Sequence, residues 1–162
     1  MKFSTIAAVL VAVSSLTTAA RAADYMEQGE RIKGRSYSPA VVTDGGRIVW
    51  LSGETTIVDL NGRDIKGDFE AQTRTIFALI DQTLKRAGGS VKDIVTMTTF
   101  LTDARNGATF AKVRTEMFPD RNFPSSAQIT VSNLAVPGML IEIQAVAVIG
   151  DKCSKANPCI PR

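Results

Sequence analysis

The segment that most constrains the fold is residues 140–149, because it alternates like a β-strand and carries a carboxylate in its middle. Successive side chains of a strand point to opposite faces, so Ile141 and Ile143 line one apolar face while Glu142 and Gln144 lie on the other. Burying an unpaired carboxylate is costly. We therefore expect the second face to meet water, a partner group or a ligand cavity.

The N-terminus has the pattern of a secretory signal peptide. Lys2 gives a positive start, residues 6–16 are an apolar run, and Ala20 and Ala22 form a small-x-small cleavage site. We predict that residues 1–22 are removed and that the mature chain is periplasmic or secreted, with no membrane attachment. An uncleaved membrane anchor is the alternative, which the shortness of the apolar run disfavours.

The residue content excludes several function classes. Without Lys2 and Arg21, 17 of the 19 basic residues remain against 16 acidic ones, a net charge of +1, so charge does not indicate nucleic-acid binding. The chain has no histidine, which removes Ser-His-Asp and Cys-His catalysis and histidine-based zinc sites. No phosphate-binding loop or dinucleotide fingerprint occurs. We expect no metal and no cofactor, and chemistry based on carboxylates, hydroxyls, Arg or Lys, and backbone amides.

The two cysteines, Cys153 and Cys159, both lie in the C-terminal tail, residues 151–162. Export would place them in an oxidising compartment, where we predict that they form a disulfide. A loop this short gains about 2 kcal/mol at most. We interpret the bond as a staple on the C-terminus; redox catalysis is the alternative, although the pair lacks the close CxxC spacing.

Hydrophobic periodicity predicts one α+β domain over residues 35–150, with the element order β-β-α-β-α-β-β and a flexible lead-in at 23–34. The first two strands flank a turn at 43–47 and are expected to form a hairpin. Asp68 is a suitable cap for the first helix, and Gly88 a suitable stop. In chain order, the expected elements are strands 37–42 and 48–51, helix 68–87, strand 94–101, helix 106–117, and strands 122–131 and 140–149.

Two helices can cover only one face of one sheet, so the face that bears Glu142 is expected to lack a cover within the monomer. That face is either solvated or packed against other copies of the chain. The apolar residues Leu140, Val146 and Val148 beside Glu142 favour the second arrangement. The sequence therefore predicts a homo-oligomer with small-molecule sites at its subunit boundaries.

A series of short motifs resembles the RidA (YjgF) family of reactive-intermediate deaminases over residues 35–149. None of these motifs is diagnostic alone, but their order and spacing together make a specific match. They are YSPAV at 37–41, VWLSGE at 49–54, AGGSVKDIV at 87–95, FLTD at 100–103, FP at 123–124 and IEIQAVA at 141–147.

The resemblance implies a chorismate-mutase-like fold, a trimer whose sheets form a central barrel, and ligand pockets in the clefts between subunits. Active members hydrolyse 2-enamines and 2-imines to 2-oxo acids and ammonia. The resemblance makes Glu142 the carboxylate that positions or activates water, Tyr37 a pocket wall, Gly53 a backbone contact to the ligand, and Ser52 and Ser126 substrate-binding neighbours. The alternatives are structural: Gly53 ends a strand, Tyr37 packs, and Glu142 pairs with a neighbouring subunit.

The sequence departs from the family at Ser126, where active deaminases carry an arginine that grips the substrate carboxylate. Arg114 and Arg121 are candidates to replace it, but we expect both to be solvated surface residues. Three functions remain: a divergent deaminase or related hydrolase that uses Glu142, a non-catalytic small-molecule-binding or chaperone-like trimer, and a ribonuclease. The near-neutral charge and missing histidine make the ribonuclease the weakest of the three.

Overall fold

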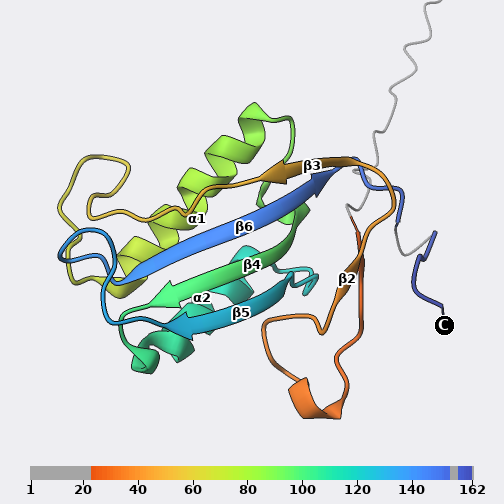
Figure 1. Cartoon of the computed structure of the whole chain (residues 1–162), viewed down its shortest axis with the longest axis horizontal. Coiled ribbons are helices and arrows are strands. Elements are labelled where there is room, and N and C mark those ends of the chain that lie inside the picture. The colour runs from red at the N-terminus through yellow and green to blue at the C-terminus, as the bar shows by residue number, and fades with distance from the viewer. Residues whose placement is uncertain (1–22, 154–156, 162) are drawn as a thin grey trace, which may run out of the picture.

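The computed structural model describes residues 23–153 and 157–161 and shows an α+β fold in which one face of a four-stranded sheet carries both helices (Figure 1). The predicted signal peptide, residues 1–22, lies outside the described residues. The sheet has the strand order β3-β6-β4-β5, and a separate two-stranded ribbon joins β1 and β2. The strands are β1 (Asp24–Tyr25), β2 (Val41–Val42), β3 (Arg47–Trp50), β4 (Ile94–Leu101), β5 (Ser125–Thr130) and β6 (Ile141–Ile149), and the helices are α1 (Phe69–Arg86) and α2 (Gly107–Met117). Three 3-10 turns complete the chain: η1 (Glu30–Ile32), η2 (Val91–Asp93) and η3 (Ala104–Asn106).

Helix α1 confirms the prediction for its segment. The Asp68 side chain caps it by accepting a hydrogen bond of 3.0 Å from the backbone N–H of Ala71. Gly88 ends it with a φ of 84°, a conformation that favours glycine. Its predicted apolar stripe is buried throughout: Phe69, Thr73, Ile76, Phe77, Ile80 and Leu84. Helical spacing and end signals were therefore enough to locate this element.

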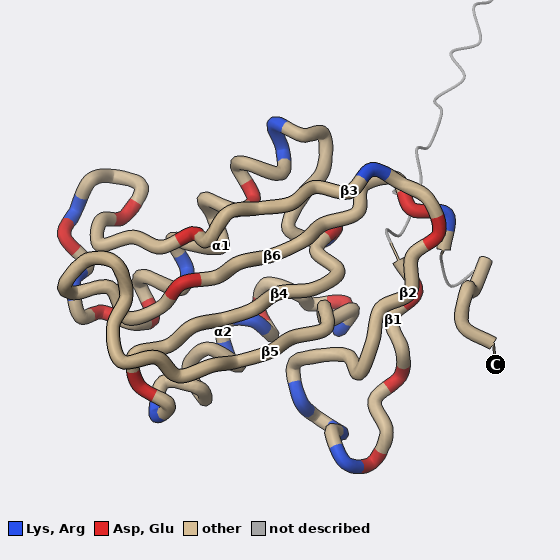
Figure 2. Tube along the Cα trace, in the orientation of Figure 1, with Lys and Arg blue, Asp and Glu red and all other residues tan. Residues whose placement is uncertain are grey.

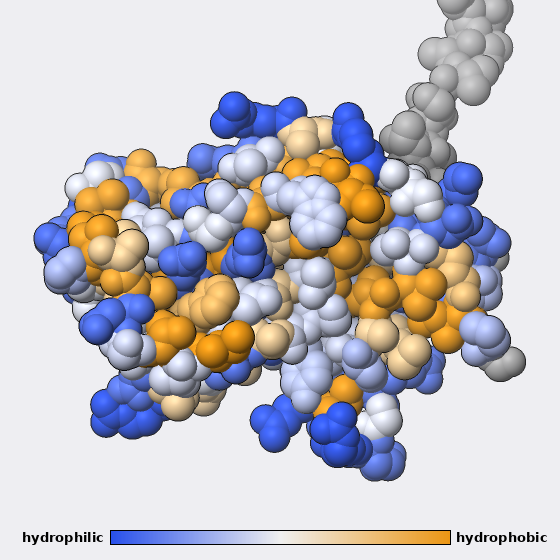
Figure 3. All heavy atoms as spheres, in the orientation of Figure 1, coloured by the Kyte–Doolittle hydropathy of each residue, from blue (hydrophilic) through white to orange (hydrophobic). Residues whose placement is uncertain are grey.

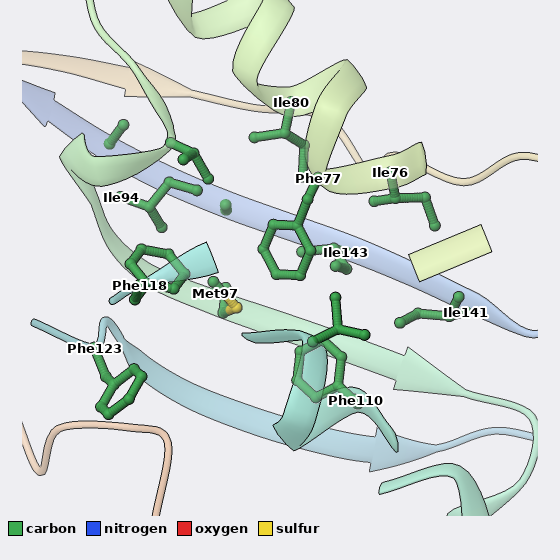
Figure 4. Close-up of a cluster of buried hydrophobic side chains, with 14 of the residues drawn as sticks. Ile76, Phe77, Ile80, Ile94, Met97, Phe110, Phe118, Phe123, Ile141 and Ile143 are labelled. Atoms are coloured by element: carbon green, nitrogen blue, oxygen red, sulfur yellow. The ribbon is translucent and has the colours of Figure 1, made fainter. Parts of the chain in front are cut away.

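The core fills the space between the sheet and the helices (Figure 4). Aromatic rings form its middle, with centroids 6.3 Å apart for Phe77 and Phe110 and 6.4 Å apart for both Phe77–Phe118 and Phe118–Phe123. Such contacts stabilise beyond the area that they bury. Ile141 and Ile143 of β6 enter the same core, so the predicted alternation of that strand is confirmed and Glu142 lies on the opposite face.

The predicted hairpin between the first two expected strands is wrong. Strand β2 pairs with β1 in the ribbon, whereas β3 pairs with β6 in the main sheet. The connecting turn is held by the C-terminal segment instead: Asp44 donates its backbone N–H to the Asp151 carboxylate, and Asp44 O accepts from Lys152 N at 3.1 Å. These contacts, across more than 100 positions in the sequence, replace the local pairing that a hairpin would use.

The helix-free face is partly covered within the monomer, which corrects the expectation of an uncovered face. Residues of the ribbon pack on one end of it, in a cluster that includes Ala23, Val95 and Val148. Leu140 packs against the main core instead of this face. The rest stays open and includes Trp50, which is 77% exposed, and Ile48, which is 55% exposed. Figure 3 shows hydrophobic surface on this face near β3.

The first and the last described segments of the chain are both part of this region of the fold. The segment predicted as a flexible lead-in, 23–34, contains β1 and η1, and its residues Ala23, Asp24 and Ile32 are buried. The predicted Cys153–Cys159 disulfide is confirmed. Within the described ranges, no helix combines the length and the apolar character needed to cross a membrane.

Candidate functional site

Glu142 lies near the start of β6, and its carboxylate reaches over Gly53, which belongs to the segment that follows β3. A Cβ atom built on Gly53 would lie 2.1 Å from Oε1 of Glu142, so only glycine leaves room for the carboxylate there. The backbone around Gly53 is fixed to β6, because Leu51 N donates to Ala145 O at 3.1 Å and Glu54 N donates to Ile143 O at 2.9 Å. The structure thus joins two residues that the sequence singled out, Glu142 and Gly53, which we call the glutamate half-site.

Ser126 is hydrogen-bonded to Arg114, which we had expected to be a solvated surface residue. Arg114 of α2 was expected on the surface, but only 5% of it is exposed. Its Nη1 donates to Ser126 Oγ at 2.8 Å, while Nε and Nη2 donate to Ser36 Oγ at 3.1 and 2.9 Å. Its guanidinium also lies over the Phe110 ring, 4.8 Å from the centroid. We call Arg114, Ser36, Ser126 and Tyr37 the arginine half-site.

Arg114 is charged and buried without a carboxylate partner. No ion pair within the described part of the chain includes it, and its three hydrogen bonds go to neutral hydroxyls. Burial lowers the pKa of its guanidinium to about 10, with nearby Tyr37 acting in the opposite direction. The group therefore remains cationic at neutral pH and is poised to attract an anion.

Tyr37 is held beside this arginine by its backbone. Gln28 Nε2 donates to the carbonyl oxygens of Arg35 and Tyr37 at 2.6 and 2.7 Å. Ser38 N donates to Pro124 O at 3.3 Å, which ties the loop to the segment that leads into β5. Tyr37 and Ser126 are both half-buried, so the arginine half-site reaches the surface along this edge of the sheet.

The two half-sites lie apart within one subunit. Met97 of β4 pairs with Ser126, whereas Phe100 pairs with Glu142, so the sites are separated by β4 and offset by three residues along it. Strand geometry makes that about 10 Å along the strands and about 10 Å across them. The half-sites also face opposite ways, since Met97 belongs to the core under the helices and Glu142 lies on the helix-free face.

The remaining candidates have simpler surroundings. Ser52 is exposed next to Gly53. Arg121 is exposed as expected, and its guanidinium lies 5.5 Å from the centroid of the Phe123 ring. Across the described residues, no group of three or more histidine, cysteine, aspartate or glutamate side chains could hold a metal ion.

Sequence reasoning missed Ser36 and Glu54, and it named Arg114 as a candidate but expected it on the surface. Arg114 follows the buried Phe110 by four positions, so helical spacing was a signal that it lies on the buried side of α2. Ser36 carried no such signal. Glu54 directly follows Gly53, so a second acidic group lies next to the glutamate half-site. Burial raises the pKa of its carboxyl above the ordinary value.

Comparison with known proteins gives consistent matches across the domain. The family model described as Endoribonuclease L-PSP matches residues 30–149. A RutC family protein of Pyrococcus horikoshii is 32% identical over 111 residues, covering 68% of this chain and 85% of that protein.

Two solved structures extend the comparison to the fold. A protein of the conserved Rid family from Yersinia pestis has a TM-score of 0.63 and 27% identity, covering 70% of this chain and 87% of that one. A member of the YjgF family from Mycobacterium tuberculosis has a TM-score of 0.56 and 28% identity, covering 78% and 98%.

The contact between Gly53 and Glu142 leads to a stability prediction. We expect Gly53→Ala to displace the carboxylate and to lower the free energy of unfolding by about 1 to 3 kcal/mol, the usual cost of overpacking. The matched control is Gly29→Ala, since nothing lies within 4 Å of a Cβ at that position. Urea unfolding of both variants measures the effect, and equal stabilities would contradict the close contact.

Proposed function

This chain belongs to the RidA (YjgF) family, the family of the matching Endoribonuclease L-PSP model, and on that premise we propose that it is a divergent deaminase acting on 2-enamines and 2-imines. The observation that carries the proposal is the buried, unpaired Arg114 against Ser126. In this proposal, Arg114 of α2, whose Nη1 donates to Ser126 Oγ at 2.8 Å, takes the part of the arginine that active deaminases carry at position 126. The substrate class is therefore one with a carboxylate next to the reacting carbon.

The geometry of Arg114 supports carboxylate binding. A guanidinium has five N–H donors, and the hydroxyls of Ser36 and Ser126 accept three hydrogen bonds from it, so two donors have no partner in the described structure. A planar carboxylate matches such a pair of donors, and charge-assisted bonds are about twice as strong as neutral ones. The two serines hold the guanidinium in place before a ligand arrives, which reduces the entropy lost on binding.

Glu142 is proposed to hold the attacking water and to accept a proton from it. Water adds to the carbon of the C=N bond, the C–N bond then breaks, and the products are a 2-oxo acid and ammonia. A carboxylate that holds the water accepts one proton from it as the new C–O bond forms and passes that proton to the nitrogen. The proton of the resulting hydroxyl follows the same route as the C–N bond breaks and the carbonyl forms. Gly53 supports this role, because its missing side chain lets the carboxylate take up this position.

Because the half-sites face apart within one subunit, we propose that they meet across a subunit boundary in a homotrimer. The open part of the helix-free face, with Trp50 and Ile48, is the surface that would pack between copies. Glu142 of one copy would then approach the arginine half-site at the β5 edge of its neighbour. The ligand would bind in the cleft between them.

We also propose that the protein acts outside the cytoplasm. The Cys153–Cys159 disulfide supports this location, since such bonds persist in oxidising compartments. The signal-peptide pattern in residues 1–22 agrees with it.

RNA cleavage is not part of the proposal, although it appears in the family description. A formal net charge of +3 for the whole chain is small, and the absence of histidine removes the usual general base. Retention on an RNA column at moderate salt would favour that function instead. A non-catalytic binding protein is the other alternative, and it would bind carboxylates without turnover.

The central test is a coupled assay in which an amino-acid oxidase supplies 2-imino acids and formation of the 2-oxo acid is timed. We expect the protein to accelerate product release and Glu142→Gln to lower the rate by about 10² to 10⁴, the range for lost general acid–base catalysis. Arg114→Gln should raise KM by about 10- to 100-fold, because a charge-assisted contact is lost.

Arg105→Gln is the matched control in that assay, since its side chain is 91% exposed and pairs only with Asp103 in the described structure. It should leave both kinetic constants unchanged. Binding without turnover would replace the deaminase by the non-catalytic alternative. Full activity of Glu142→Gln would remove the proposed mechanism.

The pKa of Arg114 gives a pH dependence. The guanidinium is cationic below a pKa of about 10, so affinity for a 2-oxo acid should stay constant near neutrality and fall as the pH rises through about 10. Titration calorimetry with pyruvate, with circular dichroism to check folding at each pH, measures this. Arg114→Lys serves for comparison, and an affinity that holds unchanged well above pH 10 would show that another group binds the carboxylate.

The trimer is tested by light scattering of the purified protein. We expect a mass three times that of one subunit, and we expect Trp50→Lys to shift the population toward monomers because it puts a charge on the packed face. Val58→Lys, at a residue 45% exposed outside the four-stranded sheet, is the control. A monomeric mass for the unmodified protein would contradict the proposal that the site forms between subunits.

A further inference from the structure

A cavity lies between the first and the last described segments of the chain, and neither Glu142 nor Arg114 lines it. Its volume is about 940 Å³, within the range of small-molecule sites. Three stretches of chain form its walls: 23–28 with part of the following loop, 120–123 before β5, and Ile160 with Pro161 from the tail. Two of these stretches carry acidic and basic residues near the ribbon of β1 and β2 (Figure 2).

Most of the charges that line this cavity are already matched. Asp24, which is buried, accepts hydrogen bonds from the backbone N–H groups of Cys159 and Ile160, both at 3.0 Å. Lys33 pairs with Glu30 at 3.1 Å, and Asp120 pairs with Lys92 at 3.9 Å. These three lining residues have little charge left to offer a ligand.

The other two charged lining residues, Glu27 and Arg121, have opposite signs and no hydrogen bond or ion pair from their side chains in the described structure. Arg121 is also held in an unusual way. Its φ of 58° is rare for a residue with a side chain, its N–H donates to Phe118 O at 2.9 Å, and its guanidinium packs on Phe123. Strain of this kind concentrates at functional positions.

We propose that this terminal cavity is a binding site for a zwitterion with an apolar body, such as a free amino acid or a short peptide. Arg121 binds the carboxylate and Glu27 the ammonium group. Apolar lining from Met26, Phe123 and Ile160 takes the side chain. The site shares none of the residues of the glutamate and arginine half-sites, although Gln28, which donates to the Tyr37 carbonyl, also lines it.

The disulfide has a role in this site. It links Cys159 to the fully buried Cys153. The bond thereby helps to fix the backbone N–H groups of Cys159 and Ile160, which donate hydrogen bonds to Asp24. Those bonds hold Ile160 and Pro161 as one wall of the cavity. The tail therefore completes the pocket, and binding should require the oxidised protein.

The test uses titration calorimetry of the purified, oxidised protein with L-leucine and with leucyl-leucine, which distinguish a free amino acid from a peptide. N-acetyl-leucine lacks the ammonium group and leucinamide lacks the carboxylate, so both should bind about 10- to 100-fold more weakly than the better zwitterion. Absence of binding by both zwitterions at about 10 mM, beyond the weak end of specific affinities, would overturn the proposal.

Variants assign the contacts. Arg121→Gln should remove the preference for leucine over leucinamide, and Glu27→Gln the preference for leucine over N-acetyl-leucine. Arg86→Gln, an exposed charge change on α1, is the control and should retain both preferences. If Arg114→Gln abolishes the leucine signal and Arg121→Gln does not, the ligand binds at the deaminase site and the terminal cavity is excluded.

Reduction tests the role of the tail. Treating the wild-type protein with a thiol reductant, or replacing both cysteines in Cys153→Ala/Cys159→Ala, should weaken leucine binding at least about 10-fold. Pyruvate binding at Arg114 should be unaffected, which verifies that the domain is still folded. Unchanged leucine affinity after complete reduction would remove the tail from the site.

Discussion

The pairing of β6 with two neighbours at once is the constraint on which the rest of the structure depends. β6 is bonded to β3 on one side and to β4 on the other, so its register is fixed from both edges. With Ile141 and Ile143 in the core, a slip by one residue would exchange the two faces and bury Glu142 instead. The energy of the apolar core therefore holds the carboxylate on the helix-free face, and Gly53 on the adjoining segment leaves the space that it needs.

A second constraint is the cost of burying Arg114. A guanidinium loses much of its hydration in a site where only 5% of the residue is exposed. Two hydroxyls and the Phe110 ring offset part of this cost, but none of them neutralises the charge. A buried charged group that has hydrogen bonds but no partner of opposite charge is typical of a binding site, where the ligand supplies that partner. The proposed carboxylate site rests on this reasoning, with Arg114 in place of an arginine at position 126.

The regular elements were predictable because their signals are local. Helix α1 followed from its apolar spacing, the Asp68 cap and the Gly88 stop, and β4 and β6 from their alternation. The hairpin expected around residues 43–47 was wrong because Asp44 is bonded to Asp151 and Lys152, far away in the sequence. The partial cover of the helix-free face by Ala23 has the same origin, since it depends on contacts to Val95 and Val148 that no local pattern reveals.

The sequence by itself determined the family, the two helices, the core strands, the disulfide and the face on which Glu142 lies. These features depend on motifs and periodic patterns that are formed by residues close together in the sequence. Only the tertiary structure decided which arginine lies beside Ser126 and that Asp24 is bonded to the tail at Cys159 and Ile160. The bond from Arg114 to Ser36 spans 78 positions, and those from Asp24 to the tail span 135 and 136. Such partners are set by how helices and strands pack, and the energy that selects them comes from burial of the whole core.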